Sequence, residues 1–260
     1  MNTIGDAAIA VLMTAQPGEK VRRSHDSAKA WFAGELAHEF PVCPPDRPAR
    51  PRKPQLLMPR YMPKRRNIVA LLHAIAHIEF NAIDLAWDMV ARFGMEMPPA
   101  FSDDWVGVAD DEARHFHMLS DRLRSHDATY GDLPAHDGLW QSAMDTAHDL
   151  PARLAIVPLV LEARGLDVTP SIIARLHKAE DEESAKVLEI IYNEEISHVQ
   201  AGQKWFRMVC EGLGKKPEPH YQNLVRQYFK GQIKPPFNRK ARDRAGLYED
   251  FYLPLVRNLK

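Results

Sequence analysis

Two copies of one pattern of glutamate and histidine stand out in this chain of 260 residues. In each copy a single glutamate is followed, 33 residues later, by the sequence Glu-x-x-His. Four carboxylates and two imidazoles in this pattern are the ligand set of a dinuclear metal centre in a helical bundle, where two helices give one glutamate each and two give Glu-x-x-His. We therefore expect a pair of metal ions held by Glu79, Glu112, His115, Glu162, Glu195 and His198.

The neighbours of these glutamates indicate that the carboxylates are buried. The residues one turn away from Glu79 on a helix are Ile75, Ala76, Ala82 and Ile83, and the other three glutamates have similarly apolar surroundings. A carboxylate in the middle of an apolar stripe faces the core, where an unpaired charge is costly. Four such charges facing one core require cations, and two divalent metal ions would balance them.

The spacing within Glu-x-x-His has its own physical reason. Three residues correspond to about 300° of helical rotation, so both side chains leave the same face about one turn apart. One such sequence arises often by chance, whereas two copies that follow a glutamate at the same interval are a specific signal. The alternative interpretation is a hydrated interior network of charged side chains without metal.

Five residues beside the ligands are candidates for supporting roles. Asp111 and Glu194 directly precede the glutamate of each Glu-x-x-His, where an acid can accept the outer N–H of a histidine on the opposite helix; otherwise they are solvated or inter-helix charges. Arg114 and Arg164 each follow a ligand glutamate by two residues and could neutralise it. Tyr192, one turn before the second Glu-x-x-His, is a candidate catalytic group that acts in redox or hydrogen bonding, with a plain core tyrosine as the alternative.

Four long helices must position these residues. We expect them at residues 66–93, 102–125, 149–165 and 181–212, with Ser102 and Asp149 as N-caps. The third is expected to stop near Gly165, and Thr169-Pro170 to start another short helix. The connection between the second and third helices is long, which is the ferritin-like connectivity. The predicted fold class is therefore all-α, a ferritin-like four-helix bundle with a long crossover.

The predicted bundle occupies residues 65–214, between two irregular extensions. Residues 1–64 contain two short helical stretches and a linker rich in proline, lysine and arginine, and residues 215–260 are expected to pack back on the bundle. Basic residues concentrate at 47–66 and 230–244. The first basic segment is interpreted as an arm that wraps the surface, with an anionic partner as the alternative.

The bulk composition indicates a soluble cytoplasmic protein. The formal net charge of −1 gives no general argument for a polyanionic partner. Cys43 and Cys210 lie far apart and are expected to be reduced thiols. The apolar stretch at residues 7–15 is too short to span a bilayer, and no other segment is expected to reach membrane length. The oligomeric state stays open, with a dimer as one option.

Several stretches of the sequence resemble a known family. They are Asp111-Glu112-Ala113-Arg114-His115 with Phe116, residues 131–140, residues 161–170, residues 195–198 with Trp205-Phe206, and Pro235-Pro236-Phe237-Asn238. The chain resembles the DUF455 family, an uncharacterised group of the ferritin-like, di-iron carboxylate superfamily. The resemblance implies a ferritin-like bundle with a dinuclear site, and no substrate. Pro158, one turn before Glu162, departs from the pattern because it removes a helical hydrogen bond and can kink the third helix.

The predicted centre suggests a non-haem oxidoreductase. Two iron ions, or a manganese and an iron ion, can activate O2 and oxidise or hydroxylate a small organic substrate. Because the sequence contains neither a dinucleotide-binding fingerprint nor a set of cysteines for an iron–sulfur cluster, the electrons must come from a separate donor.

The sequence allows two alternative functions. The first is a ferroxidase or iron-handling protein, against which the long extensions argue, because storage cages need compact subunits. The second is a tRNA-modifying hydroxylase that binds RNA through the two basic segments. RNA retention that is lost after neutralising Lys64, Arg65 and Arg66 would support the second alternative.

Overall fold

A computed structural model describes residues 2–57 and 67–256 of the chain, and every regular element in these ranges is a helix. Outside the helices, two isolated bridge contacts join Thr3 to Ala37 and Leu56 to Ala135. The chain forms two compact units, residues 1–140 and residues 141–260, and the short helix α5 (Gly138–Asp145) spans the boundary between them. The all-α fold class is confirmed.

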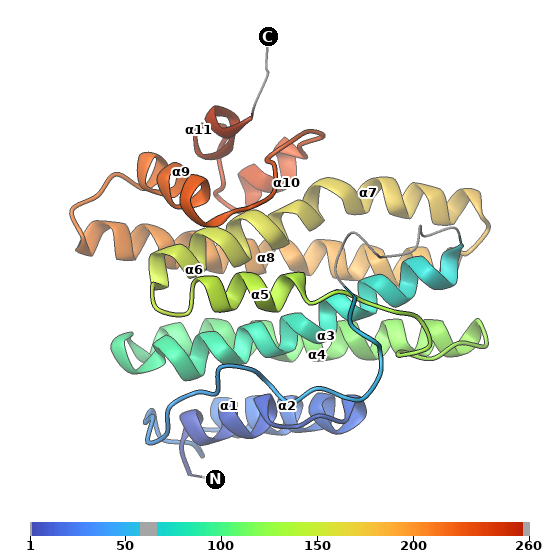
Figure 1. The fold of residues 1–260 in the computed structure, drawn as a ribbon, viewed down its shortest axis with the longest axis horizontal. Helices are drawn as coiled ribbons and strands as arrows, with labels where there is room; N and C mark the ends of the chain where they lie inside the picture. Colours follow the sequence, from blue (N-terminus) through green and yellow to red (C-terminus); the bar gives the residue numbers. More distant parts are fainter. Residues whose placement is uncertain (1, 58–66, 257–260) are drawn as a thin grey trace. The chain divides into compact units, whose positions relative to one another are not determined.

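The first unit is built on a pair of long helices. They are α3 (Ile68–Phe93) and α4 (Pro99–Ser125), joined through the short turn η2 (Gly94–Glu96). Two shorter helices, α1 (Ile4–Leu12) and α2 (Pro17–Phe32), pack against α3 and α4 respectively (Figure 1). Helix α3 is thus an apolar helix that is covered on several sides.

Helix α3 has an unusual amount of buried charge for so apolar a helix. Asn67 caps its start by accepting a hydrogen bond from the backbone N–H of Ala70 at 2.8 Å. Further along, the fully buried Asp84 pairs with the buried Lys20 and with Arg50. Each buried carboxylate in this part of the helix therefore has a cation beside it, as burial of charge requires.

By length and composition, the segment Ile68–Glu96 is apolar enough to cross a membrane. The expectation that no segment reaches membrane length was wrong for this helix. However, 67% of its most apolar window is buried inside the protein, which is the behaviour of a core helix and is consistent with a soluble protein.

The second unit is built on one interrupted helix and one continuous helix. The interrupted one consists of α6 (Leu150–Ile156), a π-helix η3 (Val157–Glu162) and α7 (Ala163–Lys178), and the continuous one is α8 (Glu182–Gly212). Asp149 caps α6 as predicted, by accepting a hydrogen bond from Ala152 N–H at 3.0 Å. The helix does not end at Gly165, and Pro170 lies inside α7 rather than starting a new helix.

The reason that α7 tolerates an internal proline is found in the C-terminal segment. Pro170 has no N–H, so the carbonyl of Leu166, four residues earlier, loses its helical partner. The side chain of Asn238 donates a hydrogen bond to that carbonyl at 3.1 Å. A residue more than seventy positions away thus replaces the missing helical hydrogen bond.

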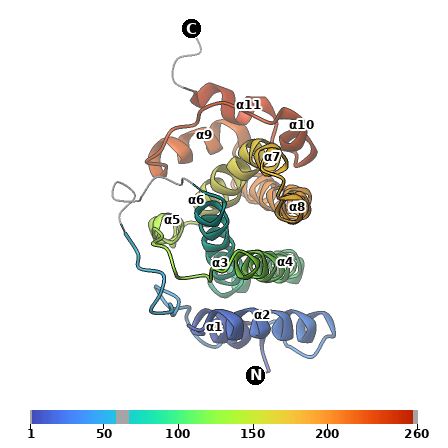
Figure 2. The same cartoon turned by 90° about the vertical axis from the view of Figure 1, so that its right-hand side faces the viewer.

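The C-terminal segment covers the second unit with three short helices. They are α9 (Pro217–Tyr228), α10 (Arg239–Arg244) and α11 (Glu249–Tyr252), followed by the turn η4 (Leu253–Leu255). Helix α9 packs on α6 and α8, and α10 packs on α7 and α8 (Figure 2). The boundary between the two compact units lies at Trp140, and the domain boundaries expected near residues 64 and 214 stay predictions.

The start of α4 also differs from expectation. Pro98 occupies the N-cap position and Pro99 the first helical turn, where its fixed φ suits a helix and its missing N–H costs nothing. Ser102 is therefore a buried residue within the first turns of α4 and not its N-cap.

Candidate metal centre

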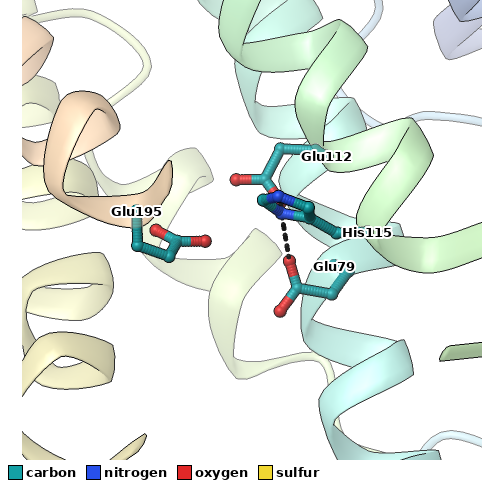
Figure 3. Close-up of side chains that lie close together, drawn as sticks. All are labelled: Glu79, Glu112, His115 and Glu195. Atoms are coloured by element: carbon teal, nitrogen blue, oxygen red, sulfur yellow. Dashed lines mark ion pairs between the residues drawn. The ribbon is translucent and has the colours of Figure 1, made fainter. Parts of the chain in front are cut away.

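The first unit brings one half of the predicted ligand set together in its core. We call Glu79 on α3 and Glu112 and His115 on α4 the N-terminal half-site. Their exposed fractions are 4%, 0% and 0%, and each offers one ligand atom within 4.8 Å of the others. His115 Nδ1 lies 3.5 Å from Glu79 Oε2 and 3.4 Å from Glu112 Oε2, and Figure 3 shows its ring beside the two carboxylates.

The electrostatics of the N-terminal half-site favour a cation among these groups. Burial alone lowers the pKa of His115, but hydrogen bonds to Glu112 and Glu79 and the charges of both carboxylates outweigh it and raise the pKa to about 11. Without metal, the imidazole therefore holds a proton that balances part of the carboxylate charge. A metal ion at Nδ1 must displace that proton, because only neutral imidazole is a ligand.

The second unit carries the other half of the set. We call Glu162, Glu195 and His198 the C-terminal half-site. Glu162 is the last residue of the π-helix, and Glu195 and His198 lie one turn apart on α8, with His198 Nδ1 3.6 Å from Glu195 Oε2. The side chain of His198 is 1% exposed and that of Glu195 is 13% exposed, so this half-site is less completely buried than its counterpart.

A close contact between helices lies beside the C-terminal half-site. Pro158 is one turn before Glu162, and Gly202 is one turn after His198. A Cβ atom on Gly202 would lie 2.5 Å from Cβ and 2.6 Å from Cγ of Pro158, closer than real Cβ contacts. Only glycine therefore lets α8 approach the π-helix at this point, which helps to fix Glu162 relative to the ligands on α8.

The sequence anticipated Pro158 but not the structure that it produces. Removal of one helical hydrogen bond is accommodated by a π-helix, which inserts extra residues into the turn that ends at Glu162. Gly202 was missed altogether. The signal that could have found it is a glycine in the interior of a long amphipathic helix, where it lowers helix stability unless close packing requires it.

Three of the five supporting candidates, Asp111, Arg114 and Glu194, bond to residues of their own helix. Arg114 donates to Asp111 at 2.6 Å, in a half-exposed pair one turn apart on α4. Glu194 is partly buried on α8, and its backbone carbonyl accepts a hydrogen bond from the hydroxyl of Ser197 at 2.6 Å. The roles expected for these residues at the ligands stay predictions.

The other two candidates contact the C-terminal segment. Arg164 donates to the carbonyls of Lys234 and Pro236, both at 2.9 Å, and lies 3.4 Å from Asp167. The hydroxyl of Tyr192 accepts a hydrogen bond from the side chain of Asn238 at 2.8 Å. Both side chains thus help to hold this segment on the second unit, and their expected roles near the metals stay predictions.

The predicted basic arms contain many internally paired residues. In residues 230–244, Lys230 pairs with Asp145, Arg239 with Glu249, and Arg242 with Asp167. In the N-terminal linker, Arg47 pairs with Asp137 and Arg50 with Asp84. Lys64, Arg65 and Arg66 lie outside the described residues. Much of the positive charge in the described parts of both arms is therefore used within the protein.

The chemistry of the donor set fits a metal ion. Each half-site contributes two carboxylates and one imidazole, which suit divalent ions such as manganese, iron and zinc, and neither contains a thiolate. The buried cluster of glutamates and histidine in the first unit could hold a metal ion.

Comparison with known proteins gives a family without an assigned activity. The family described as "Protein of unknown function (DUF455)" matches residues 13–253. An uncharacterized protein of Haemophilus influenzae is 38% identical over 255 residues, covering 90% of this chain and 87% of that protein. No solved structure matches the chain.

Proposed function

We propose that the chain, which belongs to the DUF455 family, is an oxidoreductase whose two half-sites together bind a pair of metal ions. In this proposal α3, α4, the helix α6–η3–α7 and α8 are the four helices of a ferritin-like bundle. Glu195, also labelled in Figure 3, is the residue of the C-terminal half-site that we propose as the fourth ligand beside Glu79, Glu112 and His115.

The observation that carries the proposal is the repeated donor set, buried in one unit and largely buried in the other. In the N-terminal half-site, two buried carboxylates lie beside one imidazole, and both raise its pKa. The C-terminal half-site repeats the same three side-chain types. Buried negative charge is retained in proteins where a cation balances it, and a divalent ion at each half-site would do so.

The residues of the chain have definite tasks in this proposal. The four glutamates hold the metals and balance their charge, His115 binds after giving up its Nδ1 proton, and His198 completes the ligand set. Burial of the N-terminal half-site excludes water from that side of the centre. A pair of iron ions, or of manganese and iron, would supply the reaction of O2 with a small organic substrate, with electrons from a separate donor.

Metal analysis of the purified protein tests the centre. We expect two metal ions per chain after anaerobic loading with Fe(II), and loss of metal in Glu112→Gln and Glu195→Gln. Glu189→Gln is the matched control, because Glu189 is an exposed glutamate on α8 that pairs with His177. Wild-type protein without metal, or full metal content in both ligand variants, would overturn the proposal.

The reaction class needs a separate measurement. Iron-loaded protein exposed to O2 should change its optical absorption, and the Glu112→Gln variant should not. If the wild-type protein binds two iron ions but gives no change with O2, it is a metal-binding protein and not an oxidoreductase.

A ferroxidase or iron-handling protein would use the same ligands, and its products separate it from an oxidase. Repeated additions of Fe(II) and O2 to a ferroxidase would build up Fe(III) far beyond two ions per chain. We expect saturation at two, together with a particle mass far below that of a storage shell. RNA binding is the weaker proposal, because several arginines and lysines of the arms already pair with acids.

A further inference from the structure

A partly open cavity lies in the second unit beside the π-helix, and none of the proposed ligands lines it. Its volume is about 180 Å³, and its walls come from η3, α7, α9, the segment after α9, α10 and α11. A cavity of about 150 Å³ accommodates a molecule the size of benzene. The size therefore fits a ligand built on a single ring or a short branched chain. We call this space the π-helix pocket.

Most of the wall of the π-helix pocket is apolar. Leu159 of the π-helix is fully buried, and Phe229, Ile233 and Phe237 contribute further apolar surface. Tyr221 also lines the pocket, but its hydroxyl donates to the carbonyl of Leu159 at 3.2 Å and so is already satisfied. This lining favours a hydrocarbon body.

One buried polar group in the wall lacks a partner among the described residues. Tyr252 is 0% exposed, and its hydroxyl oxygen is buried with no hydrogen bond in the part of the chain that the structure describes. Burial raises the pKa of Tyr252, so the hydroxyl is protonated and can donate at neutral pH. A ligand oxygen would satisfy a group that is otherwise costly to bury.

The charged side chains in the wall of the pocket determine which ligand charge is favoured. Arg164, Lys234 and Arg242 contribute three positive charges, and Asp167 contributes one negative charge. Asp167 is already held by Arg242 through two hydrogen bonds of 2.8 and 2.7 Å. The surplus of positive charge favours an anionic group on the ligand.

From these features we propose that the π-helix pocket is a binding site for a compact organic carboxylate with a body no larger than one ring. The hydrocarbon body lies among Leu159, Phe229 and Ile233, and the carboxylate accepts from the Tyr252 hydroxyl and faces the cationic side of the wall. This binding site requires no metal, so it stands apart from the proposed reaction. Its wall includes the three residues that precede Glu162.

Benzoate is the probe that tests the pocket, by calorimetric titration of the full-length protein. We expect saturable binding of benzoate, much weaker binding of the neutral benzamide, and none of 1-naphthoate, whose two rings exceed the cavity. Absence of saturable benzoate binding at millimolar concentration would overturn the proposal, and equal binding of benzamide would overturn the assignment to an anion.

Two variants test whether benzoate binds in this cavity. Tyr252→Phe removes only the hydroxyl and should weaken benzoate binding about tenfold. Tyr248→Phe, at the exposed N-cap of the same helix, should leave the binding unchanged. Ile233→Trp, in a segment without regular structure, should fill the pocket and abolish binding.

Unchanged benzoate binding in both Tyr252→Phe and Ile233→Trp would place the site elsewhere and overturn the proposal. Metal content measured in the same samples should equal that of the wild type. Failure of the pocket is thereby separated from failure of the metal centre.

Discussion

The two half-sites present the same three side-chain types on different kinds of helix. The N-terminal half-site stands on two uninterrupted α-helices and is almost completely buried. The C-terminal half-site takes Glu162 from a π-helix, and its Glu195 is partly exposed. Regular helices give a rigid and dry set of ligands, whereas a π-helix shifts one ligand out of register and leaves more room around it. In the proposed centre, the N-terminal half-site would be the fixed side and the C-terminal half-site the adjustable side.

Removal of a ligand histidine should have the largest effect on metal affinity, and the loss of affinity should differ between the two half-sites. His115→Ala removes a ligand from the fully buried half-site, and we expect metal affinity to fall by more than about 100-fold, since even residues that only support a ligand contribute 10- to 100-fold. His198→Ala should cost less, because water can reach the partly exposed side and replace the imidazole. Titration of both variants with Fe(II) under anaerobic conditions measures the two affinities. Equal losses would remove the distinction between the sides.

A glycine in each unit provides the next comparison. Gly202→Ala places a Cβ against Pro158 and should lower the free energy of unfolding by about 1–3 kcal/mol. Gly107→Ala on α4 has no atom within 4 Å of the new Cβ, and should raise the free energy of unfolding by about 0.5–1 kcal/mol. Urea denaturation of the metal-free variants measures both. A stabilising Gly202→Ala would show that the close approach is not needed.

The pH dependence of metal binding should report the proton on His115. Because the pKa of His115 is raised to about 11 without metal, this imidazole is protonated at neutral pH, and binding releases the proton. The apparent affinity should therefore rise about tenfold for each unit of pH between 6 and 8. His117→Gln, at an exposed neighbouring position, should keep the same slope. An affinity independent of pH would contradict the picture of a proton held in place of the metal.

The smallest expected effect concerns the polar pair that ties α4 to α2. His25 pairs with Asp110, two residues before Glu112, and the hydrogen bond and charge of that carboxylate raise the pKa of His25 above 6.5 although partial burial opposes this. The stabilisation is fully present below pH 6.5 and is lost as the pH rises through the raised pKa of the folded state. Because the pair is half exposed, it should contribute less than about 1 kcal/mol. The pH dependence of unfolding in wild type and His25→Gln measures it, and parallel curves would contradict the assignment.

The sequence predicted the features that depend on local spacing. The start of α6 at Asp149 follows from local capping chemistry, and the apolar neighbours of Glu79 and Glu112 indicated the burial that is observed. The end of the third helix was predicted wrongly because Pro170 is a local signal to stop. The partner that overrides it is Asn238, which lies far away in the sequence. The close packing of the π-helix against α8 likewise depends on Gly202, which no local pattern around Pro158 contains.

The hydrogen bond from Asn238 to the carbonyl of Leu166 has a consequence for the order in which the protein is made. During synthesis, α7 leaves the ribosome before residue 238 is translated, so its proline-broken turn stays incomplete until that residue has been made. The same side chain also bonds to Tyr192, one turn before Glu195. The two helical segments that carry Glu162 and Glu195 are therefore completed only after residue 238 has been made.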